Sequence, residues 1–141
     1  LFDRDSGKVL LEKRHAKSPN DKMAGMLVIP GGKVEGVDKV PNEDCFENAL
    51  KREIFEEFGI IVTSRTVLFD TTHTTPNGNT YDSRVYLVHG WQGNVSNVED
   101  RNEHLWLDIQ EAERLVSRPV AKRTIRVAGR CIASLLRERM I

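Results

Sequence analysis

Three glutamates near the middle of the chain constrain the protein more than any other feature. The segment from Arg52 to Gly59 reads R-E-I-F-E-E-F-G, and its glutamates stand at positions i, i+3 and i+4: Glu53, Glu56 and Glu57. On a helix, this spacing puts all three carboxylates on one face. Like charges so spaced cost a helix about a few tenths of a kcal/mol per pair. The pattern therefore indicates either a solvated helix face or a cation site, and oxygen ligands suit Mg²⁺ or Mn²⁺.

A second segment upstream favours the cation site. Residues Pro30 to Glu35 read P-G-G-K-V-E, and paired glycines let the main chain approach a ligand closely. Together the two segments resemble the signature of the Nudix hydrolases, G-x5-E-x7-R-E-U-x-E-E-x-G-U, in which U is a bulky aliphatic residue. The second half of this signature matches without a miss from Arg52 to Ile60.

The joint between the two halves departs from the signature. Counting back from the arginine puts Asp44 where the first glutamate is expected and Asp38 where the glycine is expected. About six extra residues within Gly36 to Glu43 would restore the spacing, with Gly32 in the glycine role. Asp44, or alternatively Glu43, would then replace the first glutamate.

The resemblance implies a set of metal ligands and catalytic residues. The ligands would be the carbonyl of a loop glycine and the carboxylates of the helix: Gly31, Glu53, Glu56 and Glu57. Arg52 would orient or neutralise these carboxylates. The proton of the attacking water would pass to Glu53 or to a glutamate in the loop before the last predicted strand. Glu103 is the first choice in that loop and Glu99 the second.

Three further residues are candidate substrate contacts. Arg14 closes a predicted strand from Lys8 to Arg14, and in MutT-like proteins an arginine at about this point reaches the substrate phosphates. Otherwise, Arg14 is an exposed charge at a strand end. Gly32 would let the backbone approach the substrate. Lys33 would either meet a phosphate or remain a solvated loop residue.

Local signals predict a helix from Cys45 to Phe58. Asp44 is a good N-cap, and Glu47 completes an acidic version of the capping box. Gly59 is the expected left-handed C-cap. Apolar residues recur at every fourth position of the predicted helix and form a stripe to be buried: Phe46, Leu50, Ile54 and Phe58.

Branched and aromatic residues predict β structure elsewhere. The expected strands are 26–29, 60–62, 66–72, 80–89 and 105–107, with a hairpin tip at 75–79. A short helix is expected at 109–115, and an amphipathic one after Pro119. His73 and His89 lack ligand-spaced partners and are expected to be structural or exposed. The resemblance implies an α/β fold, the Nudix α/β/α sandwich with a mixed β-sheet between helices.

Length and composition set further bounds. The 141 residues, of which 39% are hydrophobic, predict one domain over 1–141. Residues before Leu1 are expected to be missing, because the chain opens inside a predicted strand without a methionine. Zero net charge excludes a bulk electrostatic grip on nucleic acid or membrane. Cys45 and Cys131 form no disulfide framework, which favours the cytoplasm. The basic last helix leaves a monomer or a homodimer open.

The resemblance implies a divalent-metal-dependent hydrolase of a nucleoside diphosphate linked to a moiety X, a small-molecule nucleotide substrate. The W-x-G at Trp91 to Gly93 and the compact length favour nucleoside triphosphates or oxidised ones such as 8-oxo-dGTP. Pro76, sixteen residues after Ile60, favours ADP-ribose or another nucleotide sugar instead. A non-catalytic nucleotide sensor is a third alternative, supported only by the altered front half of the signature.

Overall fold

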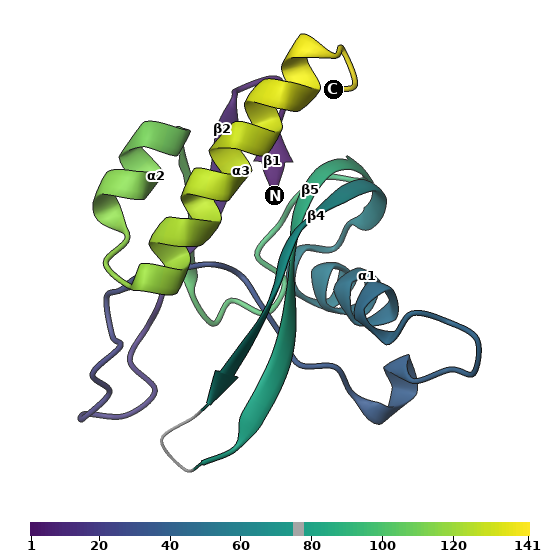
Figure 1. Cartoon of the computed structure of the whole chain (residues 1–141). Helices are drawn as coiled ribbons and strands as arrows, with labels where there is room; N and C mark the ends of the chain where they lie inside the picture. Colours follow the sequence, from purple (N-terminus) through teal and green to yellow (C-terminus); the bar gives the residue numbers. More distant parts are fainter. Residues whose placement is uncertain (75–77) are drawn as a thin grey trace.

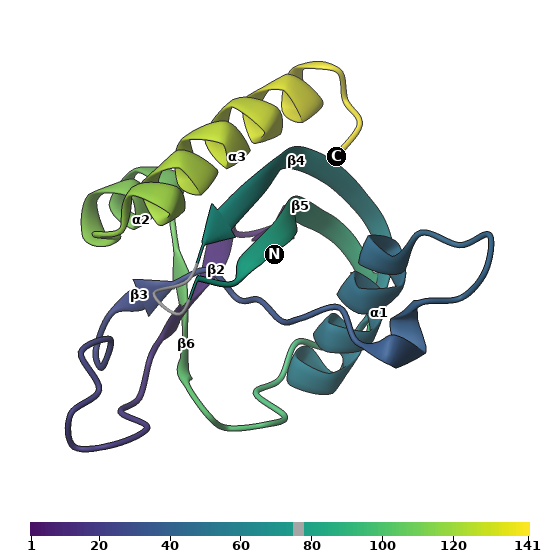
Figure 2. The same cartoon turned by 60° about the horizontal axis from the view of Figure 1, so that its bottom comes forward.

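The computed structural model describes residues 1–74 and 78–141. Two β-sheets lie between helices: α2 and α3 cover one side and α1 the other (Figures 1 and 2), which confirms the predicted α/β architecture. The elements in chain order are β1 (Phe2–Asp3), β2 (Lys8–Lys13), β3 (Leu27–Val28), the 3₁₀ turn η1 (Gly36–Asp38), α1 (Cys45–Phe58), β4 (Ile61–Thr74), β5 (Thr80–Gln92), β6 (Glu103–Leu107), α2 (Ile109–Leu115) and α3 (Pro119–Arg137).

Strand β2 is the centre of the four-stranded sheet. Strand β6 pairs along one edge of β2, while β1 and β3 pair with opposite ends of its other edge. Strands β4 and β5 form a separate two-stranded hairpin. All of these pairings are antiparallel.

Strand β2 is buried on both faces. Val9 and Leu11 pack into the apolar cluster that α2 and α3 cover, whereas Leu10 packs with Ile54 and Phe58 of α1. Successive side chains of a strand point to opposite faces, so the next residue after Leu11 shares the face of Leu10. That residue is Glu12, and the alternation directs a carboxylate toward α1.

Helix α1 has the predicted limits. The Asp44 carboxylate accepts hydrogen bonds from the backbone N–H groups of Phe46 and Glu47 at 2.9 and 3.4 Å, and Gly59 ends the helix at φ 71°. The predicted reciprocal half of the capping box is wrong, because the Glu47 carboxylate instead accepts a hydrogen bond from Arg65 Nε at 2.8 Å. Helix α1 is therefore fixed by its caps and tied to β4.

The hairpin of β4 and β5 is longer than predicted. The segments 60–62 and 66–72 belong to one strand, because register shifts between Val62 and Ser64 and between Val67 and Phe69 let the pairing continue. Strand β5 runs on to Gln92, within the W-x-G segment. Of the predicted hairpin tip, 75–79, residues 75–77 with Pro76 lie outside the described residues.

Helix α3 is amphipathic, as expected. Its buried side packs into the cluster around β2 through Ala121, Ile125, Ala128, Ile132 and Leu135. Because these apolar residues recur with the period of the helix, one face of α3 packs on the core and the other faces solvent. In the described part of the chain, no helix is long and apolar enough to cross a lipid bilayer.

Candidate active site

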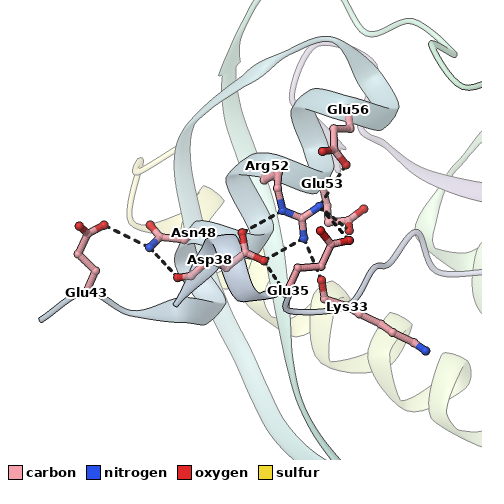
Figure 3. A network of polar contacts seen from close by, with 8 residues as sticks. All are labelled: Lys33, Glu35, Asp38, Glu43, Asn48, Arg52, Glu53 and Glu56. Carbon is pink, nitrogen blue, oxygen red and sulfur yellow. Dashed lines mark hydrogen bonds and ion pairs between the residues drawn. The ribbon is translucent and has the colours of Figure 1, made fainter. Parts of the chain in front are cut away.

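The guanidinium of Arg52 joins the glycine loop to the acidic face of α1 (Figure 3). Its Nε and Nη2 donate to the two carboxylate oxygens of Asp38, each at 2.9 Å, and Nη2 also donates to the Lys33 carbonyl at 2.9 Å. Its Nη1 donates to Glu53 Oε1 at 3.0 Å and to Glu56 Oε2 at 3.1 Å. The side chain is only 17% exposed, so these contacts hold it in one orientation.

Asp38, rather than Asp44, is the carboxylate that pairs with Arg52. Asp38 is 3% exposed and also accepts a hydrogen bond from the Glu35 N–H at 2.8 Å. The hydrogen bonds from Arg52 hold the pKa of Asp38 below its usual value. Asp44, which was expected to take the place of the first signature glutamate, caps α1. Counting forward from Gly32 with the signature spacing reaches Asp38, so the extra residues follow Asp38.

Gly32 lies directly against the carboxylate of Glu53. A Cβ built at position 32 would overlap that carboxylate, so the close approach of loop and helix depends on the missing side chain. Burial raises the pKa of Glu53, against the opposing effect of Arg52. Gly31, Gly32, Lys33 and Glu53 together line a cavity of about 760 Å³.

Glu57 stands between this cavity and a second one of about 850 Å³, and Gly31 borders both. Burial raises the pKa of Glu57 to about 8, with further increases from the negative charges of Glu12, Glu53 and Glu99. Desolvation and nearby like charge both penalise an ionised carboxylate. Carboxylates from β2, α1 and the loop before β6 therefore act on one another around Glu57.

Glu12 is a member of this group that the sequence reasoning missed. Only 6% of it is exposed, and Asn102 Nδ2 donates to its Oε2 at 3.1 Å. The available signal was one acid at the end of the apolar run V-L-L. Strand alternation from a buried β2 would have directed that acid toward α1.

The structure places the other predicted glutamates differently. Glu103 is exposed opposite Lys13, and alternation along β6 gives it the face of Leu107, which packs with α2 and α3. Glu103 therefore faces away from α1 and lines neither cavity. Glu99 lines the second cavity and acts on Glu57. The side chain of Glu56 is 48% exposed and is held by Arg52 outside both cavities.

Two candidate phosphate contacts lie on different sides of the carboxylates. Arg14 borders the second cavity, with its Nε 3.5 Å from Asp21 Oδ2. Lys33 borders the first cavity, and its Nζ lies 5.7 Å from the centroid of the Tyr81 ring. The Lys33 side chain points away from Arg52 (Figure 3).

The donor chemistry of the site fits a hard divalent cation. As the side chains stand, no three His, Cys, Asp or Glu residues among those described are grouped closely enough to hold a metal, so binding requires side-chain rotation. The available donors are carboxylate and carbonyl oxygens, which Mg²⁺ and Mn²⁺ prefer. Burial and, to a lesser extent, repulsion between carboxylates raise the pKa values of Glu53 and Glu57, and a cation would offset this penalty on the ionised forms.

Comparison with known proteins identifies the class of protein that this fold and site define. The chain matches the NUDIX domain family over residues 1–127 and therefore belongs to that family. It is a Nudix pyrophosphohydrolase, and enzymes of this family generally use divalent metal ions. A comparison with curated proteins yields no match.

Solved structures agree with this assignment. The solution structure of the E. coli ORF135 protein shares 25% identity over 94% of this chain and 87% of that one, with a TM-score of 0.70. A MutT NUDIX hydrolase from Burkholderia pseudomallei shares 30% identity over 85% and 87%, with a TM-score of 0.59. A MutT structure from a study of Aliivibrio salmonicida and Vibrio cholerae shares 27% identity over 89% and 91%, with a TM-score of 0.61.

Proposed function

We propose that this enzyme hydrolyses nucleoside triphosphates, including oxidised deoxynucleoside triphosphates, to a nucleoside monophosphate and pyrophosphate with Mg²⁺ or Mn²⁺. The observation that carries the proposal is the position of Glu57, with Gly31, between two cavities. A linear substrate lying across this junction would present its phosphates to the carboxylates and extend into both cavities. The likeness to MutT structures at 27% and 30% identity supports a triphosphate.

The carboxylates of Glu53 and Glu57 and the carbonyl of Gly31 would hold the metal ion. When bound, the ion neutralises developing negative charge, lowers the pKa of water and helps to align the phosphates. Arg52 keeps Glu53 oriented through its Nη1, while its bonds to Asp38 fix the guanidinium. Glu56 accepts a hydrogen bond from the same Nη1 of Arg52. This contact holds its carboxylate outside both cavities, which fits a position at the edge of the metal site.

A general base must take a proton from the attacking water. Glu53 and Glu99 are the candidates, because Glu53 lines the first cavity and Glu99 the second, in each case with Glu57. Glu103, the first choice from sequence, shares the face of Leu107 on β6, which favours Glu99 over it. Arg14 and Lys33 would contact the phosphates from the two cavities, and Gly32 would give the substrate access to the loop backbone.

Product analysis tests the proposal. The protein is incubated with Mg²⁺ and 8-oxo-dGTP, ordinary dNTPs or ADP-ribose, and the products are separated by chromatography. Pyrophosphate and a nucleoside monophosphate from a triphosphate are expected. Glu53→Gln should abolish this turnover, while Glu111→Gln, which removes one charge from α2, should retain it. Release of inorganic phosphate from triphosphates would contradict the proposed cleavage position.

ADP-ribose is the second candidate substrate because of the position of Pro76 in the sequence. Formation of AMP and ribose phosphate, with triphosphates untouched, would establish that alternative. A non-catalytic sensor is the third candidate. Tight nucleotide binding without turnover of any substrate in the panel, with either metal, would support it.

A further inference from the structure

Glu12 is a buried carboxylate that directly follows the buried apolar run Val9 to Leu11 of β2. It is 6% exposed, and its neighbours Leu10 and Leu11 are 2% and 1% exposed. An ionised carboxylate in such surroundings costs several kcal/mol, roughly, unless other groups compensate its charge. The groups around Glu12 therefore indicate what this residue does.

Only one of the two Glu12 oxygens receives a hydrogen bond within the described part of the chain. Oε2 accepts from Asn102 Nδ2 at 3.1 Å. Oε1 lies 3.7 Å from His104 Nε2, which is within range of an ion pair when the imidazole is protonated but beyond hydrogen-bonding distance. Since an ionised carboxylate has two acceptor oxygens, Oε1 remains available to another positively polarised group.

Neighbouring residues place this carboxylate beside the end of α1 that carries Glu57. His104, opposite Glu12 in β6, contacts the ring of Phe58 with the ring centroids 5.0 Å apart. Glu12, Glu57 and Glu99 line the same second cavity, and the charge of Glu12 acts on Glu57. A buried carboxylate and a half-buried one that line the same cavity are unfavourable as a pair of charges unless a cation lies near them.

We propose that Glu12 is an additional metal-binding carboxylate, which together with Glu57 and Glu99 binds a divalent cation at the second cavity. The Nudix signature assigns no role to this residue of β2. The inference rests on the metal-dependent hydrolysis proposed above. It extends the donor set from α1 to the central strand of the sheet.

A purely structural role for Glu12 makes a different prediction. Asn102 also accepts a hydrogen bond from the His15 N–H through Oδ1 at 3.1 Å, and its carbonyl accepts one from Asn97 Nδ2 at 2.7 Å. Glu12 would then serve only to anchor Asn102 and the loop that carries Glu99. Under that role, Asn102→Ala, which breaks the hydrogen bond, should have a larger effect than Glu12→Gln, which keeps an acceptor for Asn102.

Binding of Mn²⁺ in the absence of substrate separates the two roles. Isothermal titration calorimetry and the electron paramagnetic resonance signal of free Mn²⁺ measure the affinity and stoichiometry for wild type, Glu12→Gln, Asn102→Ala and the surface control Glu111→Gln. Glu12→Gln keeps an acceptor for Asn102 but loses the charge, and it should weaken Mn²⁺ binding about tenfold or more. Asn102→Ala keeps the charge and removes only a hydrogen-bond partner of the proposed ligand, so it should weaken Mn²⁺ binding less than Glu12→Gln does. Equal affinity in Glu12→Gln and wild type, or a loss in Asn102→Ala at least as large as that in Glu12→Gln, would overturn the inference.

Thermal unfolding in EDTA checks that each variant is folded. Glu12→Gln should melt no lower than wild type, because it removes a buried charge; if it fails to fold, Glu12→Asp replaces it in the titration. Glu12→Asp shortens the side chain and should also weaken Mn²⁺ binding. Wild-type protein that neither binds Mn²⁺ nor hydrolyses nucleotides would overturn both proposals. Wild-type turnover with unchanged Mn²⁺ binding in the Glu12 variants would overturn only this one.

Discussion

Asp38 and Arg52, which are 14 residues apart in the chain, form a two-point ion pair between η1 and α1. The pair is shielded from water, with the Asp38 side chain 3% and the Arg52 side chain 17% exposed. Removing one partner of such a pair leaves the other charge uncompensated. The geometry of the site thus depends on the contact between Asp38 and Arg52, because Arg52 in turn holds Glu53.

Asp38→Asn should destabilise the protein by about 3 kcal/mol and lower kcat, because it removes the charge that holds Arg52. Urea unfolding measures the first effect and steady-state kinetics the second. Asp44→Asn is the matched control: asparagine caps helices as well as aspartate does, and the lost ion pair with Arg84 is worth about 1 kcal/mol or less. Equal losses of stability and kcat in the two variants would show that Asp38 is no more important to the site than the exposed Asp44.

Gly32→Ala should lower kcat/KM about tenfold or more, a change of about 1.4 kcal/mol in the activation barrier. The added Cβ would displace the Glu53 carboxylate, while the backbone at residue 32 is unstrained. The melting temperature should therefore change little. Gly36→Ala serves as the control, since a Cβ there has no atom within 4 Å. Wild-type kinetics in Gly32→Ala would contradict the close packing of loop and helix.

Glu57→Gln should stabilise the metal-free protein at alkaline pH while abolishing turnover. The pKa of Glu57 is raised from 4.5 to about 8, so between these values the folded state holds a proton that the unfolded state has lost. Stability must then fall as pH rises through this window, with the full penalty above pH 8. Melting temperatures in EDTA from pH 5 to 9 should decline less in Glu57→Gln than in wild type or Glu111→Gln. Parallel declines would contradict the shift.

His89 should make the protein less stable in mild acid. Its Nε2 lies 3.0 Å from Thr66 Oγ1, its Nδ1 is buried without a partner among the described residues, and burial lowers its pKa below 6.5. The unfolded state therefore binds a proton first, and stability is lost as pH falls below about 6.5. His89→Gln keeps a polar group for Thr66 and should flatten the melting profile between pH 5 and 7. His15→Gln, at an exposed position, should leave it unchanged.

Helix α1 and two of its glutamates could be predicted because the relevant signals are local. Asp44, Gly59 and the apolar stripe fix the limits of the helix. The spacing of Glu53 and Glu57 then gives them a common face, and both border the first cavity. Glu56 has the same spacing, but its carboxylate is directed to Arg52 by a contact within the helix.

The missed residues depend on contacts between distant parts of the chain. Glu12 and Asn102 are 90 residues apart, and a glutamate is seldom buried without a partner that only the fold reveals. The position of Glu103 next to the tryptophan strand favours it from sequence, but the register of β6 opposite β2 puts it on the other face. Asp38 could have been found by counting forward from Gly32 instead of back from Arg52.

The alternation along β2 also bears on how the chain reaches its native sheet. A slip of one residue in the pairing of a strand exchanges its two faces. In β2, such a slip would bring Glu12 into the apolar cluster under α3 and move Val9 and Leu11 toward α1. A carboxylate in that cluster would cost several kcal/mol, roughly, and disfavour the slipped sheet. The side chain that borders the second cavity therefore also selects for correctly aligned chains during folding, before any substrate is present.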